Sequence, residues 1–147
     1  MRRIRAVSYV LAAVMSIGCG SDKATGPDSQ SPTTVSGVFV LQSVNAKSLP
    51  YSFTDPEASG VVFAITSDQI TLKQDGTFAE VMQVTATEGG QTSGTVTIPS
   101  SGTFVYTPST HAISLLASSG ARVTGTVQND TMTFKDDGDT FVFKRQP

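Results

Sequence analysis

The chain has 147 residues, a net charge of −2 and only 15% charged residues, whereas Ser and Thr together reach 38. A chain of this length is expected to form one domain. Its single Cys and single His exclude an internal disulfide, a Cys-cluster zinc site and a multi-His metal site. The acidic balance argues against nucleic-acid binding, which requires a basic patch. We therefore expect no metal, no cofactor and no nucleic-acid partner.

The first eighteen residues have the pattern of a secretory signal peptide. Met1–Arg5 carries three positive charges and no negative one, and Ala6–Gly18 is almost entirely apolar or small. A membrane-spanning helix needs about 20 apolar residues, so this run is too short to span a bilayer. It has the length of the hydrophobic region of a signal peptide, which we therefore predict for residues 1–18.

Residues Ser16-Ile17-Gly18-Cys19 resemble the lipobox of bacterial lipoproteins, in which a small residue precedes a cysteine that becomes the lipid-modified N-terminus. The resemblance implies lipidation of Cys19 and attachment to a membrane through its acyl chains. Gly20, rather than Asp, after the cysteine resembles lipoproteins sent to the outer membrane. We thus expect a cell-envelope protein that faces the periplasm or the cell surface. The alternatives are an ordinary signal peptide with a chance Cys, or a buried free Cys.

Residues 19–34 are predicted to form a disordered tether. Gly20–Thr34 has no aliphatic residue larger than Ala, so it cannot bury enough apolar surface to offset its ordering entropy. Without residues 1–18 the chain keeps 7 basic and 12 acidic residues, a net charge of −5. Such a body has no electrostatic attraction to an anionic bilayer.

From residue 35 to residue 147 the apolar residues alternate with polar ones, as in half-buried strands, and no helical period is evident. Asp-Gly and similar turn residues separate the short runs. We predict one all-β domain, an antiparallel up-and-down meander that closes into a small lipocalin-like barrel of about eight to ten strands. The expected strands are Gly37–Val44, Val61–Thr66, Gln69–Lys73, Thr77–Thr87, Gln91–Ile98, Thr103–Thr107, Ala112–Ala117, Ala121–Val127, Thr131–Lys135 and Thr140–Lys144.

The alternation also predicts which side chains face the interior of the barrel. A barrel of about eight strands is just wide enough to be filled by side chains or to hold one small ligand. Many of the inward side chains are aromatic and large enough to fill the interior. The sequence is therefore compatible with either a filled or an open barrel. The inward set is Phe39, Leu41, Phe63, Ile65, Ile70, Leu72, Phe78, Met82, Val96, Ile98, Phe104, Tyr106, Ile113, Leu115, Val123, Val127, Met132, Phe134, Phe141 and Phe143.

The start of the first strand, Gly37-Val38-Phe39, resembles the Gly-x-Trp opening of the lipocalins, and the resemblance extends in architecture from Val35 to Arg145. In lipocalins the Trp closes one end of the barrel, and a basic residue from the last strand packs over it. The resemblance implies this role for Phe39, with Lys144 or Arg145 as the basic residue. It also implies a small apolar ligand inside the barrel. The expected ligand contacts are Phe39, Phe63, Phe78, Glu80, Met82, Phe104 and Tyr106.

Few residues suggest catalysis. His111 falls in a predicted turn, and no Ser lies in a Gly-x-Ser-x-Gly elbow. The acidic cluster around Asp137-Gly138 is explained by hairpin chemistry rather than by calcium binding. Glu80 shares a face with inward residues, and a carboxylate in the interior must be paired or neutral. We favour the alternative, a bulge in the strand Thr77–Thr87 that turns Glu80 outward. No second acid on the inner face is apparent from the sequence.

We therefore expect that the protein is not an enzyme. The favoured function is a membrane-anchored, non-catalytic binding module for a small apolar ligand. The alternative is a filled barrel that acts as a structural or protein-interaction module and contacts another envelope protein. That alternative predicts an exposed apolar patch, for which Tyr51, Phe53 and Pro56 are the candidates.

Overall fold

The computed structural model describes residues 35–147, except residues 56, 57 and 59. The predicted signal peptide, Cys19, the predicted tether and Pro56 lie outside these residues. No segment of the described chain forms a helix with the length and apolarity that membrane crossing requires.

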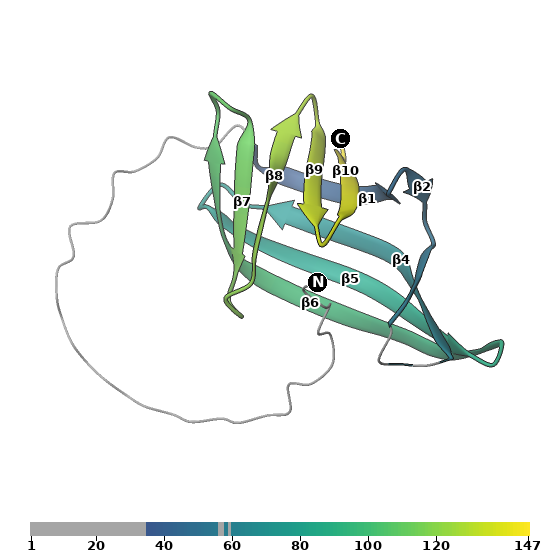
Figure 1. Ribbon diagram of the computed structural model, residues 1–147. Coiled ribbons are helices and arrows are strands. Elements are labelled where there is room, and N and C mark those ends of the chain that lie inside the picture. Colours follow the sequence, from purple (N-terminus) through teal and green to yellow (C-terminus); the bar gives the residue numbers. More distant parts are fainter. Residues whose placement is uncertain (1–34, 56–57, 59) are drawn as a thin grey trace, which may run out of the picture. The chain divides into compact units, whose positions relative to one another are not determined.

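The described chain folds into ten strands that pair in antiparallel fashion (Figure 1). Each strand from β4 to β9 pairs with the next one along the chain, as expected for a meander. The strands are β1 (Gly37–Val44), β2 (Lys47–Ser48), β3 (Tyr51–Thr54), β4 (Val61–Leu72), β5 (Thr77–Glu88), β6 (Gln91–Thr107), β7 (Ala112–Ala117), β8 (Arg122–Gln128), β9 (Thr131–Asp136) and β10 (Asp139–Arg145).

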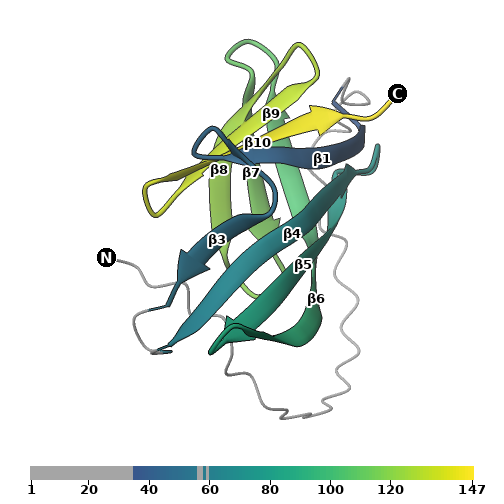
Figure 2. The same cartoon turned by 90° about the vertical axis from the view of Figure 1, so that its right-hand side faces the viewer.

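Strand β1 closes the sheet into a barrel. One of its edges pairs with β10, where Phe39 is opposite Arg145, and the other pairs with β4, where Phe39 is opposite Ile70. Eight strands, β1 and β4 to β10, thus form a closed antiparallel barrel. The long strands β4 to β6 cross the shorter strands β7 to β10 at a steep angle (Figures 1 and 2). The predicted all-β fold class is confirmed.

Strands β4, β5 and β6 continue beyond the closed part of the barrel. Strand β1 pairs only with Gln69–Leu72 of β4, and β7 pairs only with Gly102–Thr107 of β6. The remaining halves of the three long strands form an extension, which β3 joins by pairing with Val62–Ile65. The sequence had indicated a single connection without strands at this place, so β2 and β3 were missed.

A β-bulge in β4 explains one difference from the prediction. Val61–Thr66 and Gln69–Lys73 were expected as two strands, but they form one continuous strand whose register shifts between Ile65 and Ser67. The extra residue at a bulge reverses the inward and outward phase of the residues that follow. As a result Asp68 points into the barrel, where the sequence had suggested a turn.

A second pair of predicted strands, Gln91–Ile98 and Thr103–Thr107, also forms one strand, β6. Pro99 lies within this strand, and not at a strand end as predicted. The proline is tolerated because β6 has a partner on one side only at this position, so no ladder bond needs its missing N–H. Gly102 marks the corner where β6 meets β7, since a Cβ there would lie 2.0 Å from the Leu116 carbonyl oxygen.

The core occupies the closed part of the barrel and follows the predicted alternation closely. Phe63, Met82, Tyr106, Val123 and Phe141 are partly buried against it. The buried residues that were predicted to face inward are Phe39, Leu41, Ile65, Ile70, Leu72, Phe78, Phe104, Ile113, Leu115, Val127, Met132, Phe134 and Phe143.

The burial of two residues was predicted wrongly. Val96 is 61% exposed and Ile98 is 38% exposed. Both lie on the inner face, opposite Val84 and Met82 of β5, as the alternation predicts. They stay exposed because they belong to the extension, where β7 does not reach β6.

Candidate functional site

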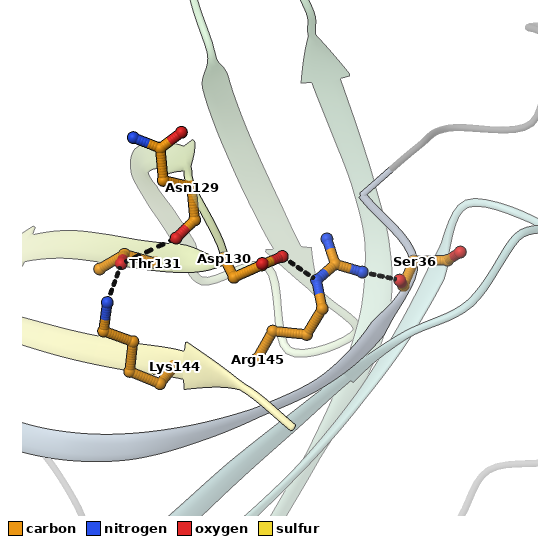
Figure 3. A network of polar contacts seen from close by, with 6 residues as sticks. All are labelled: Ser36, Asn129, Asp130, Thr131, Lys144 and Arg145. Carbon is orange, nitrogen blue, oxygen red and sulfur yellow. Dashed lines mark hydrogen bonds and ion pairs between the residues drawn. The ribbon is translucent and has the colours of Figure 1, made fainter. Parts of the chain in front are cut away.

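One end of the barrel is closed by Arg145 and Phe39. The Arg145 guanidinium lies over the Phe39 ring, 4.8 Å from its centroid. It also pairs with Asp130, at 2.8 Å between Nε and Oδ1, and donates to the backbone carbonyl of Ser36 (Figure 3). Lys144, the other candidate, instead donates to a threonine hydroxyl on β9 at 2.6 Å. Of the two basic residues considered, Arg145 is therefore the one that packs over Phe39.

A polar hollow of about 400 Å³ lies at this end of the barrel, and Arg145, Asp130, Tyr106 and His111 help to line it. The chain itself already provides partners for these groups. Arg145 is paired with Asp130, and Nδ1 of His111 lies 3.3 Å from the Tyr106 hydroxyl. His111 is exposed in a turn, as predicted. These four side chains of the hollow therefore already have polar partners within the chain.

A second cavity, of about 220 Å³, lies near the opposite ends of strands β7 to β10. It opens beside the β7–β8 and β9–β10 turns and reaches the middle of β4, β5 and β6. Most of its walls are apolar side chains that belong to the barrel core or border it. The lining residues are Asp68, Ile70, Phe78, Glu80, Met82, Ser100, Leu115, Ala117, Ala121, Arg122, Val123, Phe134, Asp136, Phe141 and Phe143.

Asp68 is the most deeply buried polar residue of the described chain. Only 2% of it is exposed, and its Oδ1 has no hydrogen-bond partner among the residues that the structure describes. The pKa of Asp68 is raised to about 8, mainly by burial and in addition by the charge of Glu80, and a hydrogen bond from the Gln69 backbone opposes the shift. Asp68 thus presents an unsatisfied carboxyl group to the cavity at neutral pH.

Glu80 lies beside Asp68 on the neighbouring strand. In the pairing of β4 with β5, Glu80 is opposite Ile70, which is the next inward-facing residue of β4 after Asp68. Burial raises the pKa of Glu80, and a hydrogen bond with the Ser100 side chain opposes that rise. The interpretation favoured from the sequence, a bulge that turns Glu80 outward, is wrong, because Glu80 lines the cavity. The bulge lies in β4 instead.

Two further charged residues line the cavity, and both are exposed. Arg122 follows the β7–β8 turn and donates from Nη1 to Ser114 Oγ at 3.1 Å. Asp136 ends β9. No ion pair joins a basic residue to Asp68 or Glu80 in the described chain, and no group of three or more potential metal ligands forms there. The two inner carboxyl groups therefore lack a compensating cation.

The fold, the cavity and its two carboxyl groups are the basis on which the function can be inferred. No protein-family model, curated protein or solved structure matches this chain. The structure brings three of the predicted ligand contacts, Phe78, Glu80 and Met82, together in the cavity.

The other four predicted contacts lie elsewhere. Phe39 is buried beneath Arg145, and Tyr106 lines the polar hollow. Phe63 stacks on Phe53 in the extension, with 5.7 Å between ring centroids. Phe104 is part of the packed core. The alternation identified inward residues correctly, but it could not show where along the barrel the interior stays open.

Asp68 was missed because the segment Ser67-Asp68 has the composition of a turn. The sequence nevertheless contains a signal. Ile65 and Ile70 both face inward although they are an odd number of residues apart, which requires one extra residue between them. Counting back from Ile70 then places Asp68 on the inner face. Its proximity to Glu80 depends on the pairing of β4 with β5.

Proposed function

We propose that the protein is a lipid-anchored, non-catalytic binding module whose barrel takes up a small, mainly apolar ligand. The observation that carries this proposal is the 220 Å³ cavity with walls of core side chains. Drug-sized ligands occupy larger pockets, of about 300–1,000 Å³, whereas an apolar cavity of about 150 Å³ holds benzene. A single ring or a short alkyl chain is thus the size of ligand that fits.

The two carboxyl groups fit binding better than acid–base catalysis. Burial raises the pKa of both Asp68 and Glu80, and no His or Cys of the described residues lines the cavity beside them. His111 lines the polar hollow, and it is not among the residues that line this cavity.

Benzyl alcohol is a suitable first probe, and we expect it to bind the purified full chain saturably. Burial of the ring should give a negative heat-capacity change in isothermal titration calorimetry. Ala117→Leu, which adds a side chain at the cavity wall, should abolish this binding. Ala112→Leu lies on the same strand but is not part of the cavity wall, so it should bind as the wild type does.

Two results would contradict the binding proposal. The first is the absence of saturable binding by the wild type. The second is equal binding by the Ala117→Leu and Ala112→Leu variants.

The membrane anchor is the second part of the proposal, and the signal-like residues 1–18 and Cys19 support it. We expect Cys19→Ser to move the protein from the membrane fraction to the soluble fraction, because the acyl chains have lost their attachment site. The thermal unfolding midpoint should stay unchanged, since Cys19 precedes the barrel domain. Fractionation followed by immunoblotting, with thermal unfolding of both proteins, measures this. Retention of Cys19→Ser in the membrane fraction would contradict the anchor.

An alternative function is an interaction module of the cell envelope, and the extension favours it. Val96 and Ile98 expose apolar side chains there, next to the edge of β6 that β5 does not cover. Tyr51 and Phe53, which the sequence suggested for such a patch, are instead partly buried against the core. Loss of a protein contact in Val96→Thr, with normal benzyl alcohol binding, would support this alternative.

A further inference from the structure

We propose that the ligand carries a positively charged ammonium group, held between Asp68 and Glu80, on a small apolar body. This inference rests on the proposed function and names the chemical class that the same cavity would take. It starts from the inner end of the cavity, where two carboxyl groups lie without a cation.

The unsatisfied oxygen of Asp68 is the first argument. A buried acceptor without a hydrogen bond is costly, so such groups in native proteins require an explanation. Asp68 is 2% exposed, its Oδ1 has no hydrogen-bond partner within the described part of the chain, and it lines the cavity. An ammonium group placed there would donate a hydrogen bond to this oxygen and compensate the negative charge that Asp68 acquires when it ionises.

The position of Glu80 is the second argument. Glu80 lies diagonally across from Asp68 on the neighbouring strand, a spacing at which side chains of adjacent strands can reach a common partner. Ser100 on β6 hydrogen-bonds Glu80 and adds a third oxygen on the same side of the cavity. An ammonium group has three N–H donors, which match this set of acceptors.

The apolar walls of the cavity favour an organic cation over a metal ion. Calcium takes six to eight oxygen ligands and magnesium requires near-octahedral oxygen coordination. Around Asp68 and Glu80 the described lining is mostly apolar, with Phe78, Met82 and Phe143 among the walls. Such walls favour the hydrocarbon part of a ligand. A primary amine with one ring or a short alkyl chain meets both requirements.

The two remaining charged residues of the cavity lie at its mouth. Arg122 is exposed at the mouth and is hydrogen-bonded to Ser114, so it does not neutralise the inner pair. Asp136 is also exposed at the mouth. The inner end of the cavity therefore becomes negative as Asp68 and Glu80 ionise, and solvent screens the charges at its opening.

Matched probes test the inference. Benzylamine and benzyl alcohol share one ring and differ in the charged group, and both are titrated into the purified full chain at pH 5, 7 and 8. We expect benzylamine to bind about tenfold more tightly than benzyl alcohol at pH 8. The preference should shrink toward pH 5, where Asp68 is protonated. At pH 7, binding of benzylamine should release a proton, which titrations in buffers of different ionisation enthalpy detect.

Isosteric variants test whether Asp68 and Glu80 cause the preference for benzylamine. Asp68→Asn and Glu80→Gln should each remove most of the preference for benzylamine, measured as the ratio of the two dissociation constants in the same variant. Asp136→Asn is the matched control, because it removes an exposed carboxyl group from the mouth and should change the preference less than about twofold. Circular dichroism checks that each variant is folded.

The outcomes separate the two proposals. Binding of benzyl alcohol without a preference for benzylamine would overturn the ammonium site and leave the proposed binding function intact. A preference that persists in Asp68→Asn and Glu80→Gln would also overturn the ammonium site. Failure of both probes to bind would overturn the binding function together with this inference.

Discussion

The free energy of unfolding is expected to fall by several kcal/mol as the pH rises from about 4 to about 8, because Asp68 is buried. Burial raises its pKa from 3.8 in the unfolded chain to about 8 in the folded protein. Below pH 3.8 the group is protonated in both states and has no effect. Between the two values the folded state holds a proton that the unfolded state has lost, so stability decreases with pH. Each unit of difference corresponds to about 1.4 kcal/mol.

Urea unfolding of the wild type and of Asp68→Asn at pH 5, 7 and 9 measures this effect. The variant should lose most of the decrease and should be more stable than the wild type at pH 9. Burial also raises the pKa of Glu80, so a smaller decrease in stability with rising pH should persist in Asp68→Asn. Asp136→Asn serves as the exposed control. Parallel pH profiles for the wild type and Asp68→Asn would show that Asp68 titrates normally in the folded state.

Phe39→Ala is expected to cost about 3–5 kcal/mol of unfolding free energy, the range for removal of a buried aromatic side chain. Phe39 is fully buried and lies where β1 joins both β10 and β4. Its loss would open a void at the closure of the barrel and would also remove the ring under Arg145, a contact worth about 0.5–2 kcal/mol.

Two controls separate these contributions to the stability of the barrel. Phe39→Leu keeps most of the apolar volume but removes the ring, so it should cost less than Phe39→Ala. Phe53→Ala removes an aromatic side chain that is only partly buried in the extension, and it should also cost less. Urea unfolding at one pH compares all of these variants. A cost for Phe39→Ala no larger than that for Phe53→Ala would contradict the role of Phe39 at the closure.

Much of the fold could be predicted because it depends on local chemistry. Turns such as Asp137-Gly138 adopt the positive φ angles that their residues favour. The contact of a basic residue with Phe39 was expected from the resemblance to lipocalins, although the sequence left Lys144 and Arg145 as alternatives. Arg145 has this role because the pairing of β10 with β1 places it opposite Phe39.

The site was harder to predict because it depends on long-range geometry. The inward position of Asp68 depends on a bulge, and its proximity to Glu80 depends on strand register. Val96 has the alternation of a core residue, yet it is exposed because β7 ends before reaching it. A single sequence gives the phase of each strand but not the length over which its neighbour covers it.

The pairing of β1 with both β10 and β4 has a consequence for how the chain folds. The contact between Phe39 and Arg145 joins the two ends of the barrel domain. Contacts between residues so distant in sequence form slowly, because the entropy of closing a long loop is lost before they contribute stability. A partly synthesised chain that lacks β10 would therefore keep one edge of β1 unpaired. The finished barrel can assemble only after the last strand has become available.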